Sequence, residues 1–85
     1  MRTFTFEIIL PDAAGRKIET YSVTLYTRAG QITLLAGHAD LITLTEKGKI
    51  TIKTDMGELS LYAESGMLYV SGGNARLLTD KANEV

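Results

Sequence analysis

The residues of this sequence best suited to chemistry are His38 and Asp40, which stand two positions apart in the glycine-flanked segment Gly37-His38-Ala39-Asp40. His38 is the only histidine, and the chain has no cysteine. A neighbouring carboxylate can orient and charge an imidazole, so one hypothesis is an enzyme in which His38 and Asp40 meet a distant nucleophile such as Ser65. The alternative is a turn histidine whose ring bonds a nearby backbone group.

The rest of the sequence supplies little support for catalysis. The carboxylates are scattered, and no spacing of His, Cys, Asp or Glu specifies a metal site. Gly66, Gly72 and Gly73 are expected in hairpin turns, whereas a phosphate-binding loop lies between a strand and a helix. We therefore expect no catalytic residue, no metal, no cofactor and no bound nucleotide.

Charge and hydropathy exclude two further classes. Nine basic against ten acidic residues give a net charge of −1, and no basic cluster is present to attract nucleic acid or anionic lipid. No apolar run approaches the ~20 residues that a membrane-spanning helix needs. We expect no nucleic-acid partner and no direct membrane insertion.

Short strands must position the histidine segment, because apolar and polar residues alternate with a period of two along most of the chain. The alternation begins with Phe4, Phe6, Ile8 and Leu10 and ends at Pro11. Further strands are predicted over 18–27, 31–35, 41–45, 49–54, 58–63, 67–71 and 75–79. This spacing predicts one all-β domain over 1–85, an antiparallel sandwich or barrel, with an ordered core over about 3–80 and a frayed tail over 81–85.

The parity of each strand separates a predicted core from a predicted surface. The inward set is Phe4, Phe6, Ile8, Val23, Leu25, Ile50, Ile52, Leu59, Leu61, Leu68 and Val70. The large apolar residues of the opposite parity are Ile9, Tyr26, Leu35, Tyr62, Tyr69 and Leu78. If these outward residues cluster, they mark a surface for a partner.

The segment from Gly30 to Ile42 resembles the glycine-histidine-alanine loop of the epsilon subunit of F-type ATP synthases. Thr33, Ala36 and Asp40 stand where that family commonly has a glycine and two prolines, and the remaining family positions in this segment fit. The residues that fit are Gly30, Gln31, Ile32, Leu34, Gly37, His38, Ala39, Leu41 and Ile42. The likeness continues through 47–52, 61–70, 73–74 and 77–80, so it covers about residues 3–80.

The resemblance implies an antiparallel β-sandwich of about ten short strands, like the N-terminal domain of the epsilon subunit. It also implies a non-catalytic rotor subunit of the central stalk, which docks on the gamma subunit and on the ring of c subunits and helps couple proton or sodium movement to ATP synthesis or hydrolysis. The implied location is peripheral, on the cytoplasmic face of the bacterial inner membrane or its organellar equivalent.

The resemblance, together with the outward positions in the alternation, predicts two sets of residues that contact partner subunits. The candidate contacts to the c ring are Gln31, His38, Ala39, Asp40 and Ile42. The candidate contacts to gamma are Ile9, Tyr26, Tyr62, Tyr69 and Leu78. We expect segments 28–31 and 37–42 to lie side by side at one end of the sandwich.

Epsilon subunits usually continue into two C-terminal helices that inhibit ATP hydrolysis. The sequence ends at Val85, where those helices begin in the family, so this polypeptide is expected to lack the inhibitory arm. A rival hypothesis from another class is a small β-sandwich module that binds a ligand or a peptide, which requires a concave site with converging polar groups.

Overall fold

The computed structural model describes residues 2–84 and consists of ten β-strands within that range. The strands are β1 (Phe4–Ile9), β2 (Arg16–Thr20), β3 (Ser22–Thr27), β4 (Gly30–Leu35), β5 (Leu41–Thr45), β6 (Gly48–Thr54), β7 (Gly57–Ala63), β8 (Gly66–Ser71), β9 (Asn74–Thr79) and β10 (Ala82–Glu84). The predicted all-β class is confirmed.

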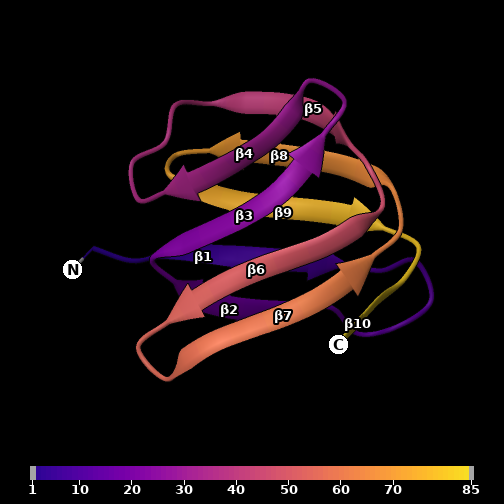
Figure 1. Cartoon of the computed structure of the whole chain (residues 1–85), viewed down its shortest axis with the longest axis horizontal. Coiled ribbons are helices and arrows are strands. Elements are labelled where there is room, and N and C mark those ends of the chain that lie inside the picture. Colours follow the sequence, from indigo (N-terminus) through magenta and orange to yellow (C-terminus); the bar gives the residue numbers. More distant parts are fainter. Residues whose placement is uncertain (1, 85) are drawn as a thin grey trace.

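The strands form one curled sheet that packs against itself as a sandwich. The hydrogen-bonded order is β10-β7-β6-β3-β5-β8-β9-β1-β2, and β4 pairs with β3 outside this path. In this order the two layers are joined by hydrogen bonds at a single β3–β5 pair, Thr27 opposite Thr45. One layer is therefore β4-β3-β6-β7-β10 and the other is β5-β8-β9-β1-β2, and β3, β6 and β7 cross in front of β1, β2 and β9 in Figure 1.

Strand pairing departs from the predicted antiparallel pattern at one place. β1 runs parallel to β9, with Phe6 opposite Ala75 and Ile8 opposite Leu77. The other strand pairs are antiparallel among the residues that the structure describes. A parallel pair needs a long connection, and here the connection is the seven strands from β2 to β8.

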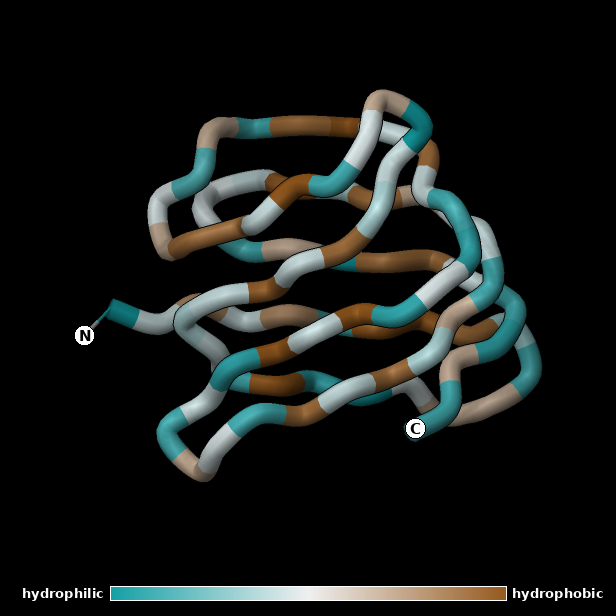
Figure 2. The backbone as a smooth tube through the Cα atoms, in the orientation of Figure 1, coloured by the Kyte–Doolittle hydropathy of each residue, from teal (hydrophilic) through white to brown (hydrophobic). Residues whose placement is uncertain are grey.

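The core lies between the two layers and follows the alternation of the sequence, which Figure 2 shows along β6 and β7. Ten of the eleven predicted core residues are buried, while Leu59 is half-buried and packs against them. The core also includes Leu34, Ala63, Ala75 and Leu77. Each has the inward parity of its strand, so the period of two located the core correctly.

The predicted single strand over 18–27 is wrong, because the chain changes layers at Tyr21. Thr20 is fully buried at this corner, and its hydroxyl oxygen accepts the Ser22 N–H at 3.1 Å. The Thr20 hydroxyl is also bonded to the Lys53 carbonyl, and the Tyr21 N–H donates to the same carbonyl at 3.1 Å. One threonine side chain thus satisfies backbone groups that a break in the ladder leaves unpaired.

The predicted frayed tail over 81–85 is also wrong within the described residues. Ala82–Glu84 form β10 and pair with β7, with Ala82 opposite Ala63. The Arg16 guanidinium bonds the Glu84 carboxylate at 3.0 Å and so connects β10 to β2 across the open side of the sandwich. Val85 lies outside the described residues.

Gly66 begins β8 and does not lie in a hairpin turn, contrary to expectation. A Cβ atom at this position would lie 2.0 Å from the Leu78 carbonyl oxygen, so only glycine fits against β9. Ser65, one residue earlier, has a negative φ, since positive φ angles occur only at glycines in the described part of the chain.

Candidate partner-binding surface

The histidine segment is a tight turn at one end of β4. The His38 N–H donates to the Leu35 carbonyl at 3.1 Å, and Gly37 supplies the positive φ of 81° that such a turn requires at its third residue. The His38 Nδ1 lies 2.7 Å from the Ala39 carbonyl oxygen. Because a carbonyl only accepts, Nδ1 carries the proton, and His38 is a turn histidine bonded to backbone.

The catalytic hypothesis fails on geometry. The Asp40 carboxylate accepts the Gly72 N–H at 3.2 Å and is not bonded to the His38 ring. Ser65 lines a hollow at the other end of the sandwich together with Arg28 and Glu46. The three residues do not converge, so they form no nucleophilic site.

The expectation that segments 28–31 and 37–42 lie side by side is wrong. β4 separates them, because Gly30 pairs with Thr27 at one end of β3 and Leu35 pairs with Ser22 at the other end. Six strand residues at ~3.3 Å each span roughly 20 Å. Figure 1 shows the 28–29 turn and the 36–40 loop at opposite ends of β4. Gln31 is thus distant from His38, Ala39 and Asp40.

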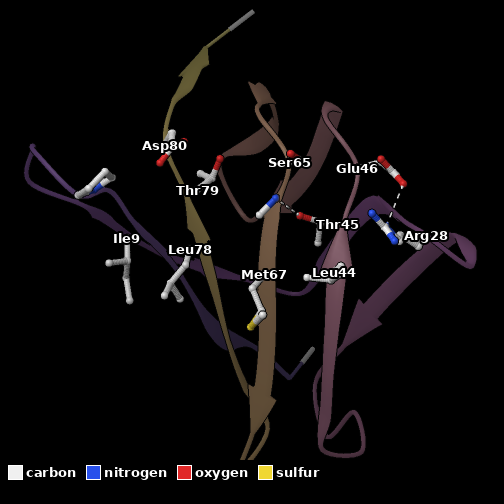
Figure 3. A pocket seen from close by; sticks show the side chains of 12 residues that line it. Ile9, Arg28, Leu44, Thr45, Glu46, Ser65, Met67, Leu78, Thr79 and Asp80 are labelled. Atoms are coloured by element: carbon white, nitrogen blue, oxygen red, sulfur yellow. Dashed lines mark hydrogen bonds and ion pairs between the residues drawn. The ribbon is translucent and has the colours of Figure 1, made fainter.

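An apolar row crosses four neighbouring strands on the outer side of the second layer. Leu44 of β5 is opposite Met67 of β8, Met67 is opposite Leu78 of β9, and Leu78 is beside Ile9 of β1. Figure 3 shows these four side chains in line across the strands. At ~4.8 Å between strands the row is about 14 Å long.

A second row lies two residues further along each strand, on the same outer side. Ile42 is opposite Tyr69, Tyr69 is opposite Arg76, and Arg76 is beside Glu7. The Arg76 Nε lies 3.5 Å from a Glu7 carboxylate oxygen, so the row changes from apolar residues to an ion pair. We call the six apolar residues of both rows the apolar face: Ile9, Ile42, Leu44, Met67, Tyr69 and Leu78.

The apolar face is accessible to solvent. Ile42 is 68% exposed and Leu44 43%, while the remaining members are half-buried or only slightly more exposed. Three hollows lie along this side, the largest with a volume of about 540 Å³. A contiguous exposed apolar surface of this kind is typical of a protein interface.

Two threonine hydroxyls and one ion pair in the largest hollow are already bonded within the chain. The Thr45 hydroxyl oxygen accepts the Gly66 N–H at 3.0 Å, and the Thr79 hydroxyl donates to the Glu64 carbonyl at 2.8 Å. Arg28 at the margin faces Glu46, with 3.9 Å between the charged atoms. This arrangement favours a macromolecular surface over a pocket for a small ligand, which needs converging polar groups.

Charged residues gather beyond the apolar row at the end of the sandwich that holds the 28–29 turn. Figure 3 shows Arg28, Glu46 and Asp80 at this margin of the hollow. The Glu64 N–H donates to the Lys81 carbonyl at 3.0 Å, so two further charged residues belong to the same end. We call this region the charged end. It consists of Arg28, Glu46, Glu64, Asp80 and Lys81, together with Gln31 near the same turn.

The outer side of the other layer is polar by comparison. Thr24, Thr51 and Ser60 form one row across β3, β6 and β7. Tyr26 and Tyr62 are about half exposed on these strands, and Tyr62 lies opposite Lys49. The five residues predicted to contact gamma therefore divide between two faces: Ile9, Tyr69 and Leu78 lie on the apolar face, and the two tyrosines do not.

Sequence reasoning left Leu44 and Met67 out of the partner surface. Both have the outward parity of their strands, as Ile9 and Leu78 do, so their positions in the alternation carried the signal. Ile42 was assigned to the histidine segment, but it lies on β5 beside Tyr69. Adjacency across strands depends on register, which the sequence alone did not provide.

The electrostatics of the described residues show little sign of a catalytic site. The Thr5 and Thr3 hydroxyls donate to the exposed Glu19 carboxylate and lower the pKa of Glu19 below its ordinary value. No group of three potential metal ligands gathers anywhere in residues 2–84. Nor does this range hold a helix with the length and hydropathy to cross a bilayer.

Comparison with known proteins identifies the family. A family model described as the β-sandwich domain of the ATP synthase delta/epsilon chain matches residues 3–85. The chain is 32% identical over 82 residues to an ATP synthase epsilon chain of Endomicrobium trichonymphae, covering 96% of this chain and 59% of that protein. It is 25% identical over 85 residues to an ATP synthase epsilon chain of Jannaschia sp., covering all of this chain and 64% of that protein.

A solved structure has the same fold. A chain in the OSCP/F1/c-ring assembly of the Euglena gracilis mitochondrial ATP synthase superposes with a TM-score of 0.87 at 17% identity, covering 96% of this chain and 53% of that one. The chain thus spans about three fifths of the length of these curated relatives. On the sequence match and the fold together, this chain belongs to the ATP synthase delta/epsilon family, of which it forms the β-sandwich domain.

Proposed function

We propose that this chain is a non-catalytic rotor subunit of an F-type ATP synthase, part of the central stalk, and helps couple proton or sodium movement to ATP synthesis or hydrolysis. Its partners are the gamma subunit and the ring of c subunits. The relatives named ATP synthase epsilon chain support this role. The assembly then holds the chain peripherally at the membrane, on the cytoplasmic face in a bacterium.

The observation that carries the proposal is the difference between the two outer surfaces. On one layer the apolar residues form two adjoining rows, the apolar face. On the other layer the exposed Tyr26, Tyr62 and Leu35 do not adjoin in this way, because the polar row of Thr24, Thr51 and Ser60 separates the two tyrosines from Leu35. Apolar residues outside the core contribute little to an isolated fold and much to an interface. We therefore assign gamma to the apolar face, with Leu78 and Met67 at its centre.

The c ring is assigned to the charged end. By the family resemblance the c ring presents polar loops to this domain. The charged end offers the Arg28–Glu46 ion pair at the turn that leads into Gln31. The 36–40 loop lies at the opposite end of β4, so a flat ring meets only one of the two ends. His38, Ala39 and Asp40, which adjoin Ile42, then belong to the rim of the gamma surface.

Binding of single variants to the gamma subunit from the same organism tests the gamma assignment. Leu78→Ala and Met67→Ala are expected to weaken binding by about 2 kcal/mol or more, roughly 30-fold, and each is compared with Tyr62→Ala on the polar side. Tyr62→Ala is expected to change affinity less than threefold. Loss of affinity in Tyr62→Ala with none in the other two contradicts the assignment.

Cross-linking tests the ring assignment. Because the sequence has no cysteine, Gln31→Cys and Ala39→Cys each provide a single thiol in the assembled complex. We expect Gln31→Cys to cross-link to a cysteine in the polar loop of the c subunit and Ala39→Cys to cross-link to gamma. The reverse pattern shows that the other end meets the ring.

A further inference from the structure

The 36–40 loop is connected to the β8–β9 turn by one side-chain hydrogen bond. Asp40 immediately precedes β5, whose first residue, Leu41, pairs with Val70. Asp40 therefore stands opposite Ser71, and its Oδ1 reaches one residue further to accept the Gly72 N–H at 3.2 Å. A carboxylate bonded to a backbone N–H makes a stronger contact than a neutral acceptor.

The turn that receives this bond has a fixed conformation. Ser71 is opposite Asn74, which leaves Gly72 and Gly73 as a two-residue hairpin loop. Their φ angles are 60° and 83°, both in the left-handed region that such a hairpin loop requires. Asn74 holds the other side, because its Oδ1 accepts the Thr5 N–H of β1 at 3.1 Å.

The two loops also lie close to each other. A Cβ atom added at Gly73 would lie 3.9 Å from the Gly37 nitrogen, so the space between the turn and the 36–40 loop is no wider than a methyl group. On its other side, a Cβ atom added at Gly37 would lie 3.5 Å from the Arg2 guanidinium. This proximity and the Asp40 bond are independent observations that put the loop in one place.

We propose that Asp40 is a positioning residue: its carboxylate fixes the His38 loop to the β8–β9 turn and so sets the geometry in which this loop meets a partner. A proline, which the resemblance leads us to expect at this position, would restrict φ but offer no side-chain acceptor. In this chain the hydrogen bond from Asp40 orders the loop instead. The partner part of the inference rests on the proposed function, and the positioning part does not.

Amide hydrogen exchange in the isolated chain, followed by NMR, tests the positioning. Asp40→Ala removes the acceptor and is expected to speed exchange of the Gly72 amide roughly 2- to 10-fold, with a parallel rise at His38. Asp40→Asn keeps an oxygen acceptor and is expected to stay within twofold of the wild type. Asp55→Ala, in the β6–β7 turn at the same end, removes one negative charge and is expected to leave both amides unchanged.

Two results would overturn the inference. One is an Asp40→Ala chain whose Gly72 amide exchanges at the wild-type rate, which means that the bond contributes no protection. The other is faster exchange at Gly72 with none at His38, which means that Asp40 holds the turn but does not position the loop.

The partner arm uses the Ala39→Cys cross-link to gamma in the assembled complex. With Asp40→Ala added, the cross-linking yield is expected to fall severalfold, and with Asp40→Asn it is expected to remain. A yield that stays constant while the amides at Gly72 and His38 exchange faster leaves the positioning intact and refutes the docking role given to this loop.

Discussion

Replacement of Gly66 by alanine is the most direct test of how the second layer is packed. The added Cβ atom would lie 2.0 Å from the Leu78 carbonyl oxygen and 3.0 Å from its carbon, and real Cβ contacts essentially never fall below 3.0 Å. The β9 backbone must therefore retreat by about 1 Å. Gly66 pairs with Thr79 across this ladder, and its N–H donates to the Thr45 hydroxyl, so the movement strains bonds on two sides.

The expected cost follows from these contacts. Overpacking a well-packed site costs about 1–3 kcal/mol, and loss of one hydrogen bond adds about 1 kcal/mol, giving about 2–4 kcal/mol. For 85 residues, the whole free energy of unfolding is about 4–13 kcal/mol. Gly66→Ala is therefore expected to remove a large share of the stability.

Urea denaturation followed by circular dichroism measures this loss as a change in the free energy of unfolding. Ser65→Ala is the control, since Ser65 is exposed and adjacent in sequence, and it is expected to stay within about 0.5 kcal/mol of the wild type. A Gly66→Ala chain that unfolds within 1 kcal/mol of the wild type would refute the close approach of β8 and β9.

Three further changes probe other parts of the fold. Thr20→Val leaves the buried Ser22 N–H at the layer crossing without its acceptor and is expected to cost about 1–3 kcal/mol in urea denaturation. The Thr5 and Thr3 hydroxyls make the pKa of Glu19 lower in the folded state than in the unfolded state. The stability that the Glu19 carboxylate contributes is therefore present above the unfolded-state pKa and is lost as the pH falls through the folded-state pKa. Thr5→Val is expected to raise the folded-state pKa of Glu19 in an NMR titration. Arg16→Ala removes an exposed ion pair and is expected to cost less than about 1 kcal/mol, while amide exchange in β10 speeds up.

The period of two predicted which residues enter the core, because it depends only on parity within each strand. Phe6, Val23 and Ile52 are fully buried, as their positions require. The layer crossing at Tyr21 coincides with a change of parity, because Ile18 and Thr20 face the core before it and Val23 and Leu25 face the core after it. The prediction of one strand over 18–27 missed this change. What makes the break possible is the contact with Lys53, which is distant in sequence.

The candidate surface was predictable in kind but not in arrangement. Outward apolar residues such as Leu78 follow from the alternation, but the row that joins them depends on the β1–β9 and β5–β8 registers. The positions of Gln31 and His38 were misjudged because a strand carries the chain from one end of the sandwich to the other. Two loops that flank a single strand therefore lie at opposite ends of the sandwich, whereas two loops separated by two strands lie at the same end.

The parallel pairing of β1 with β9 also bears on the time course of folding during synthesis. β1 is made first, yet one of its two neighbours, β9, is made about 70 residues later, which at 5–20 residues per second is roughly 4–14 s. Until then one edge of β1 is unpaired, and Phe6 and Ile8 lack their neighbours Ala75 and Leu77 in the same layer. A nascent chain that stops before Asn74 is thus an aggregation-prone species with an unpaired, apolar first strand, and the domain reaches its native state only as a whole.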